Sequence, residues 1–172
     1  MKLLIIVDFQ KDYVDGTLGI PKAKELEDKI YNIIPEYDNY IFLMDTHDKQ
    51  YLDTFEGKML PTPHCIKDSI GYQIYGKVNE YKKTALAVIN HNTFSSLELA
   101  EFLKNHPEFD EVDLCGLYSH MQVLSNAIMV KSVLKNSLIS VLKNYSASFD
   151  SSLEAKGYNI LNGLHIEISN KL

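Results

Sequence analysis

Residue types that bind divalent metal ions recur at short spacing in residues 45–64. Asp45 and His47 are separated by one residue, and His64 follows in a loop that contains two prolines and can fold back. Alternate residues of an extended segment point to the same side, so Asp45 and His47 can share one ion. Imidazole and carboxylate ligands suit zinc, iron or manganese. We therefore predict a divalent-metal site at Asp45, His47 and His64, with Glu56 lying between them in the sequence; hydrogen-bonded loop histidines are the alternative.

A carboxylate ends the first apolar run of the chain. Asp8 follows Leu3-Leu-Ile-Ile-Val7 directly. A buried carboxylate is unfavourable unless another group pairs with it. We therefore predict that Asp8 belongs to a polar site, and the alternative is that it caps the turn that follows.

Short apolar runs alternate with amphipathic stretches, which favours βαβ units and a parallel sheet. The predicted strands are 2–8, 39–45, 85–90, 111–116, 138–142 and 164–168. Pro21 can occupy the first position of a helix, and apolar residues follow it at helical spacing: Ala23, Leu26, Ile30, Ile33 and Ile34. This pattern predicts an α/β fold of three layers, α/β/α, with a mostly parallel, Rossmann-like sheet of six strands. We expect one domain that spans 1–172.

Three further helices carry start signals. Ser96 and Asp150 precede amphipathic stretches, and Ser119 with Gln122 forms a capping box. In such a box the serine caps the helix and the glutamine reaches back to it. The predicted helix 121–134 is apolar over most of its circumference.

Polar residues fall at the predicted C-terminal ends of four strands. These are Asp8, Asp45, His91 and the turn 116–122. Open parallel sheets bind ligands beyond the carboxyl ends of their strands, where the strand order reverses. We therefore expect these four positions to converge on one site.

Composition disfavours several classes of partner. The chain has 172 residues, a net charge of −6 and no arginine, which argues against a nucleic-acid groove. Only the apolar run 3–7 precedes Asp8, which is too short for an export signal or for a membrane span of ~20 residues. Cys65 and Cys115 form no CxxC pair, and so few cysteines suit a reducing cytosol. We expect a small-molecule ligand, no nucleic acid, no membrane and a cytoplasmic location.

Three segments together resemble the isochorismatase-like hydrolases, and within them a nicotinamidase-type branch. They are the segment 3–16, the segment from Met44-Asp-Thr-His47 to Pro63-His-Cys65, and the segment from Leu114-Cys-Gly116 to Gln122-Val-Leu-Ser-Asn-Ala127. The resemblance covers nearly the whole chain. It implies an isochorismatase-like fold, a homo-oligomer, and a metal that receives the pyridine nitrogen of nicotinamide. The residues it places around that metal are Asp45, His47, Glu56 and His64.

The resemblance also identifies two departures at the catalytic positions. Asp8 matches the aspartate that activates a nucleophilic cysteine in this family. His91, in Val88-Ile-Asn-His91-Asn-Thr-Phe, stands where close relatives carry a lysine, and it is either a cation, a base or a plain polar strand end. Gln122 stands where relatives carry the cysteine. A carboxamide has no thiolate form, so the covalent thioester route is closed.

The sequence offers few residues that could replace the lysine and the cysteine that the resemblance expects. Lys82 and Lys83 lie eight or nine residues before His91 and are expected to be surface charges. Cys115 lies within a predicted strand, while Cys65 adjoins a candidate metal ligand and is the one thiol expected near the pocket. Residues that the resemblance places around the ligand are Tyr13, Phe55, Tyr72, Leu117 and Tyr118. The aromatic rings of the tyrosines and of the phenylalanine could stack on a flat ligand.

Three functions remain open from these residues. The leading hypothesis is a catalytically inactive relative that senses or sequesters nicotinamide, nicotinate or a larger NAD-derived nucleotide at a metal-centred pocket. The second is an amidohydrolase that uses metal-bound water, with Asp8 or His91 as the base. The third is an assembly subunit whose helix 121–134 pairs with an active homologue.

Overall fold

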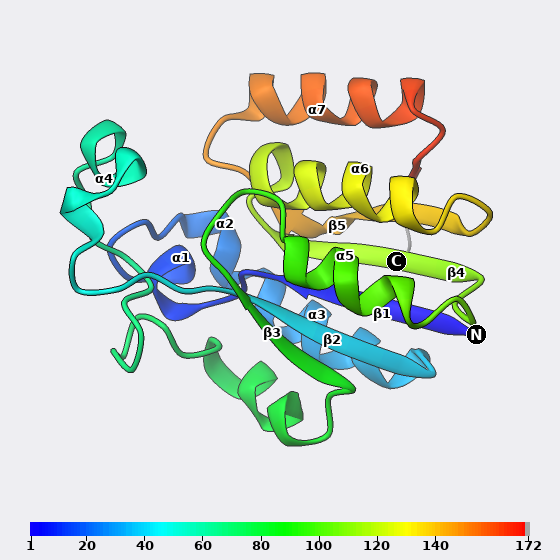
Figure 1. Ribbon diagram of the computed structural model, residues 1–172, viewed down its shortest axis with the longest axis horizontal. Helices are drawn as coiled ribbons and strands as arrows, with labels where there is room; N and C mark the ends of the chain where they lie inside the picture. The colour runs from blue at the N-terminus through cyan, green and yellow to red at the C-terminus, as the bar shows by residue number, and fades with distance from the viewer. Residues whose placement is uncertain (171–172) are drawn as a thin grey trace.

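A computed structural model describes residues 1–170 of the chain (Figure 1). Within these residues, six parallel strands form one sheet in the order β3-β2-β1-β4-β5-β6. The strands are β1 (Lys2–Val7), β2 (Asn39–Asp45), β3 (Ala87–His91), β4 (Glu111–Leu117), β5 (Leu138–Ala147) and β6 (Glu167–Ser169). The strand order reverses between β1 and β4, so the crevice in which such sheets bind ligands lies at the C-terminal ends of these two strands.

Helices cover both faces of the sheet, which confirms the three-layer α/β/α prediction. One face carries α1 (Lys11–Val14), α2 (Pro21–Lys24) and α3 (Leu26–Ile33), and the other carries α5 (Leu97–Lys104), α6 (Leu124–Val133) and α7 (Ser151–Gly163). In β1, Leu4 and Ile6 share a buried cluster with α3, whereas Leu3 and Ile5 share one with α6. This division follows from the alternation of side chains along a strand.

Shorter elements connect these layers. Short α4 (Phe55–Met59) stands apart from the sheet in Figure 1. The 3₁₀ helices are Ile34–Glu36, Tyr51–Asp53 and Gly76–Lys83. Among residues 1–170, none of the helices is both long and apolar enough to cross a bilayer. Residues 171 and 172 of the predicted domain lie outside the described part, and a single domain over 1–172 stays a prediction.

Central α6 lies between α5 and α7 on its face of the sheet (Figure 1). Ala127 and Val130 of α6 are fully buried, and Leu124 and Ile128 pack against the same cluster. A helix with neighbours on both flanks needs apolar residues over most of its circumference. This position explains the apolar pattern of the predicted helix 121–134 without a partner subunit.

Two of the predicted helix starts are confirmed, and one is wrong in part. Ser96 caps α5 by accepting from the Leu99 N–H at 3.0 Å, and Asp150 caps α7 in the same way. Ser119 does not cap a helix. It begins a π-helical turn, Ser119–Val123, and its hydroxyl donates to Glu154 at 2.8 Å, because a carboxylate on α7 lies within reach. The predicted helix 121–134 therefore becomes this turn followed by α6.

Several predicted strand ends differ from the observed ones. The first strand stops at Val7 because Asp8 takes a left-handed φ of 48°. The predicted strand 138–142 continues to Ala147 as β5, through a register shift opposite the bend at Gly116. The predicted strand 164–168 begins only at Glu167, because α7 runs to Gly163. The predicted strand 85–90 is β3, Ala87–His91.

Candidate metal centre and adjoining cavity

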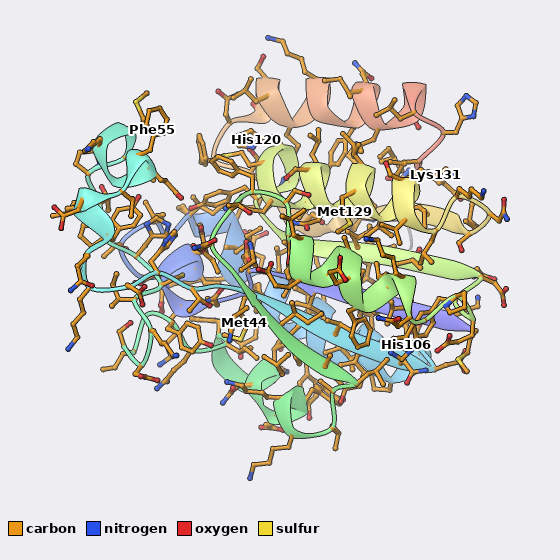
Figure 2. All side chains as sticks on the ribbon, viewed as in Figure 1. Met44, Phe55, His106, His120, Met129 and Lys131 are labelled. Atoms are coloured by element: carbon orange, nitrogen blue, oxygen red, sulfur yellow. The ribbon has the colours of Figure 1, made fainter. Side chains whose placement is uncertain are left out.

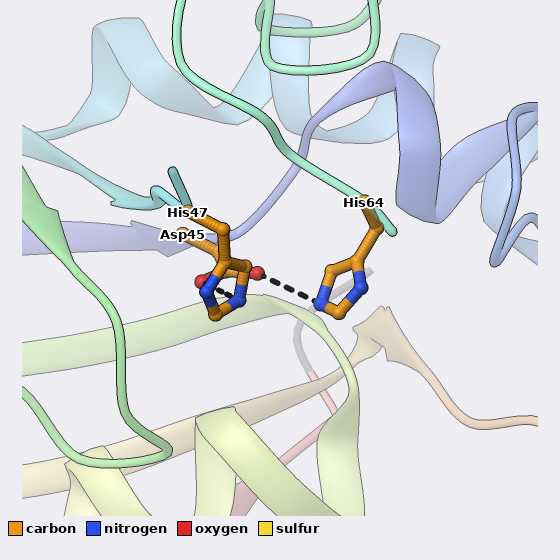
Figure 3. A group of neighbouring side chains, drawn as sticks. All are labelled: Asp45, His47 and His64. Atoms are coloured by element: carbon orange, nitrogen blue, oxygen red, sulfur yellow. Dashed lines mark ion pairs between the residues drawn. The ribbon is translucent and has the colours of Figure 1, made fainter. Parts of the chain in front are cut away.

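Three potential metal ligands meet at the C-terminal end of β2 (Figure 3). The His47 Nε2 atom lies 3.1 Å from Asp45 Oδ1, and the His64 Nε2 atom lies 3.3 Å from Asp45 Oδ2. One ligand atom from each of the three lies within 4.8 Å of the others. Glu56 Oε1 is 3.9 Å from each imidazole Nε2. The structure thus brings together the whole predicted ligand set.

Neighbouring groups orient these side chains toward one point. The Thr62 carbonyl lies 2.8 Å from His64 Nδ1, so Nδ1 carries the proton and Nε2 is free to bind a cation. Gln10 fixes the Asp45 backbone by donating to its carbonyl at 2.8 Å and accepting from its N–H at 2.8 Å. Among the described residues, the buried Nε2 of His47 has no hydrogen-bond partner.

The charges of this group fit a divalent cation. Burial would raise the pKa of Asp45, but its contacts with His47 and His64 hold that pKa well below the usual range. Asp45 is therefore a carboxylate at neutral pH. Two imidazole nitrogens beside a buried carboxylate form a donor set that zinc, iron and manganese accept. The residues present would hold such an ion through His47, His64 and Asp45, with Glu56 at the open side.

A second buried pair lies at the ends of β1 and β3. His91 Nε2 is 2.8 Å from Asp8 Oδ1, and His91 Nδ1 is 2.6 Å from the Thr93 carbonyl. Both partners are acceptors, so both ring nitrogens donate and the imidazole is a cation. Burial would lower the pKa of His91, but the Asp8 carboxylate raises it to about 9. His91 therefore supplies a positive charge at the position where the resemblance places a lysine.

Asp8 itself is fully buried behind His91. Burial raises its pKa and His91 opposes that shift. The Asp45 backbone N–H donates to its Oδ1 at 3.0 Å, and among residues 1–170 its Oδ2 has no partner. A non-glycine residue with φ of 48° is uncommon, and such residues occur often at functional sites. Asp8 joins the metal ligand Asp45 to the cation His91.

Gln122 lies in the π-helical turn with both ends of its carboxamide engaged. Its Oε1 accepts from the Tyr118 N–H at 3.1 Å, and its Nε2 donates to the Tyr13 hydroxyl at 3.0 Å. The Tyr13 hydroxyl in turn donates to Asp45 Oδ2 at 2.8 Å. A hydrogen-bonded chain therefore runs from residue 122 through Tyr13 to the metal ligands. The glutamine reach-back of the predicted capping box survives, but it goes to Tyr118.

Little space remains between the candidate metal ligand Asp45 and the buried His91. The gap that borders Asp45, His91, Gln122 and Tyr13 has a volume of about 10 Å³. A cavity of this size holds roughly one water molecule. A pyridine ring does not fit into this small gap beside Asp45 and His91.

A much larger cavity of about 640 Å³ adjoins the metal ligands on their open side. Glu56 and His64 border it, and so do three of the five residues predicted to contact a ligand: Tyr13, Phe55 and Tyr118. The other two lie elsewhere. Leu117 is buried in the core, and Tyr72 donates to Asn90 Oδ1 at 2.7 Å.

Neither cysteine borders this cavity, among the residues that the structure describes. Cys65 and Cys115 are both fully buried, and burial raises the pKa of each thiol far above neutrality. Lys82 lies over the ring of Tyr72. Among residues 1–170, Cys65, Cys115, Lys82 and Lys83 border neither the cavity nor the small gap beside Asp45.

Sequence reasoning missed several residues of the site. Gln10, which orients Asp45, sits two residues after Asp8 and could have been found as a second polar residue at that strand end. Phe149 lines the cavity at the end of β5, but the predicted strand stopped at 142 and hid it. Apolar wall residues had no sequence signal that separates them from core residues: Leu18, Ile20, Met59, Leu60, Phe94 and Met121.

Comparison with known proteins extends these observations. The isochorismatase domain model matches residues 2–131. Nicotinamidase from Bacillus subtilis is 25% identical with a TM-score of 0.82, and the match covers 98% of this chain and 99% of that chain. No curated protein sequence matches the chain.

Two more distant structures share the fold. Yeast nicotinamidase, bound to the inhibitor nicotinaldehyde, is 20% identical with a TM-score of 0.85, and the match covers 99% of this chain and 100% of that one. The pyrazinamidase of Pyrococcus horikoshii, in complex with zinc, is 18% identical with a TM-score of 0.83, and the match covers 99% of each chain.

Proposed function

The chain belongs to the isochorismatase family, and from this membership we propose that it binds a small nicotinamide-like ligand at a metal-centred pocket without hydrolysing it. The likeness to nicotinamidases and the retained metal ligands support the choice of ligand. A divalent ion held there would offer a coordination position to a ligand nitrogen or oxygen. The protein would then sense or sequester the molecule.

The proposal rests mainly on one observation, the identity and hydrogen bonding of Gln122. It stands at the entry to α6, where an isochorismatase-type hydrolase needs a thiol, and both ends of its carboxamide are hydrogen bonded. A carboxamide cannot form a covalent acyl intermediate. The buried Cys65 and Cys115 offer no substitute among the described residues.

Hydrolysis by metal-bound water is the alternative, and the geometry of its candidate bases argues against it. His91 has both ring nitrogens engaged as donors and is a cation at neutral pH. Asp8 is fully buried and does not border the cavity. A general base must reach the proton that it removes directly or through one water molecule.

The proposal is tested by titrating zinc-loaded and metal-free protein with nicotinamide in a calorimeter. We expect saturable binding to the zinc-loaded protein, weaker binding without metal, and no ammonia released above a protein-free blank. Absence of heat with zinc-loaded protein would reject ligand binding. Steady ammonia release would instead favour the metal-water hydrolase.

A further inference from the structure

The 640 Å³ cavity is a funnel with a polar floor and an apolar rim. At the floor, Gln122 and His64 are only 5% and 1% exposed. At the rim, Phe55, Met59 and Phe149 are 82%, 74% and 59% exposed. Phe55 projects from α4 at the edge of the molecule (Figure 2). The rim side chains come from α4 and from the loop between β5 and α7, so they face the cavity from two separate elements.

The volume exceeds what one ring requires. Cavities that enclose drug-sized ligands span roughly 300–1,000 Å³, and this cavity lies inside that range. The small gap beside Asp45 and His91 admits no ring. A ligand that meets the metal ligands His64 and Glu56 therefore approaches from the funnel, and most of its body must lie against the apolar walls.

The walls also select against phosphate groups. No lysine borders the cavity among residues 1–170, and the chain has no arginine. The carboxylate of Glu56 faces the same space. Phosphate binding normally relies on these cations or on free backbone N–H groups. A nucleotide would bring its phosphates into a lining that is mostly apolar and whose one carboxylate, among the described residues, is Glu56.

We infer that the cavity takes an uncharged two-part molecule, a flat head group bearing one donor nitrogen or oxygen and a second apolar ring or chain. The head lies at the floor beside His64 and Glu56. The apolar part lies between Met59 and Phe149. This inference rests on the proposed function and narrows its ligand from nicotinamide-like molecules and nucleotides to apolar amides without phosphate.

A small molecule fits this cavity better than the surface of a second copy. The apolar walls converge on a buried polar floor, which the flat surface of another subunit cannot reach. A ligand with a polar head and an apolar body matches both parts. Pairing of two copies through the rim is the competing outcome, and it predicts a change of oligomeric state in rim variants.

The test compares three probes on the zinc-loaded full-length protein by calorimetry: nicotinamide, nicotinamide with a benzyl group on its amide nitrogen, and nicotinamide mononucleotide. We expect the benzyl compound to bind at least about tenfold more tightly than nicotinamide. Binding buries the apolar surface of its benzyl ring away from water. The mononucleotide should bind more weakly than nicotinamide. In Phe149→Ala and Met59→Ala the advantage of the benzyl compound should fall to about threefold or less.

Ile160→Ala is the matched control, because Ile160 is an exposed apolar residue of α7 that does not border the cavity. It should leave the affinity ratio unchanged. If nicotinamide binds but the benzyl compound binds no better, or if the mononucleotide binds best, the inference is overturned while the proposed function stands. If no probe binds, the proposed function itself fails. A rim variant that alters the oligomeric state in size-exclusion chromatography while keeping the affinity ratio would overturn the inference in favour of pairing.

Discussion

The metal corner and the catalytic corner of this site lie side by side at one sheet edge, yet they have diverged to different degrees. At the metal corner, Asp45, His47 and His64 retain every side-chain type that the resemblance requires. At the catalytic corner, Asp8 keeps a cationic partner, His91, but Gln122 stands where the resemblance places a cysteine. The difference indicates that binding chemistry and covalent chemistry can separate within one pocket.

Hydrogen bonds link the two corners. Tyr13 bonds to Asp45 and to Gln122, and Asp8 bonds to the Asp45 backbone and to His91. Buried polar groups are usually paired, so the residue at position 122 needs hydrogen-bond partners on both sides. A glutamine with both ends bonded meets that requirement.

We expect the largest effect from removing a metal ligand, which should abolish metal binding at the metal corner. His47→Ala deletes one of three buried ligands, so we expect zinc content to fall from about one equivalent to background in elemental analysis. His106→Ala is the control, because His106 is a half-exposed histidine paired with Glu108 outside the site. Equal zinc content in both variants would show that the ion, if bound, sits elsewhere.

Restoring the nucleophile should bring the catalytic corner back toward hydrolysis. Gln122→Cys should create a thiol more reactive toward alkylating reagents than Cys65 or Cys115, since the start of a helix stabilises a thiolate. Combined with His91→Lys, it should recover more nicotinamide turnover than either change alone, because catalytic groups act as a unit. An inert thiol at residue 122 would mean that this turn has been matched wrongly to the family.

Removing the buried cation tests how much His91 contributes to the stability of the fold through its pairing with Asp8. His91→Ala leaves Asp8 buried without its partner, and we expect a loss of roughly 3–5 kcal/mol in the free energy of unfolding. Because the folded-state pKa of about 9 lies above the ordinary value of 6.5, the stabilisation is full below pH 6.5. It should disappear as the pH rises through about 9.

His91→Lys keeps a positive charge at residue 91 but changes the shape of the side chain, so it tests the role of the charge in the same experiment. Lysine stays cationic beyond pH 9, so denaturant unfolding of this variant should lack the decline that the wild type shows between pH 6.5 and 9. A wild-type stability that stays flat across this range would contradict a cationic His91.

The smallest expected effect comes from cutting the link between the corners. Tyr13→Phe removes one hydroxyl and leaves Asp45 Oδ2 and the Gln122 amide with one contact fewer. Mutation of a group that orients a metal ligand typically lowers metal affinity about 10–100-fold. We expect the zinc affinity of Tyr13→Phe to fall by an amount at the low end of that range. Competition with a chelator measures this affinity. Tyr72→Phe, whose hydroxyl bonds only to Asn90 in the described residues, should not change it.

Local sequence signals were sufficient for the metal corner and for the fold. The spacing of Asp45 and His47, the apolar run before Asp8 and the alternation of strand and helix patterns each depend on neighbouring residues. These features predicted the ligand group, the presence of all six strands and the three layers. The family resemblance added the roles of His91 and Gln122.

Long-range contacts were beyond the reach of the sequence. The Tyr13 hydroxyl meets Asp45 and Gln122 from positions 32 and 109 residues away, and no local pattern encodes that meeting. The extension of β5 was missed because Lys143 and Asn144 interrupt its apolar run. The cavity escaped prediction because its walls combine single residues from several separate segments.

The most direct test of binding without hydrolysis follows one sample of zinc-loaded protein and nicotinamide by proton NMR over a day. We expect the nicotinamide resonances to broaden on adding protein, to sharpen when a chelator removes the zinc, and to keep their full intensity with no nicotinate signals. Growth of nicotinate signals at a rate proportional to the protein concentration would contradict this result and identify the chain as an active amidohydrolase.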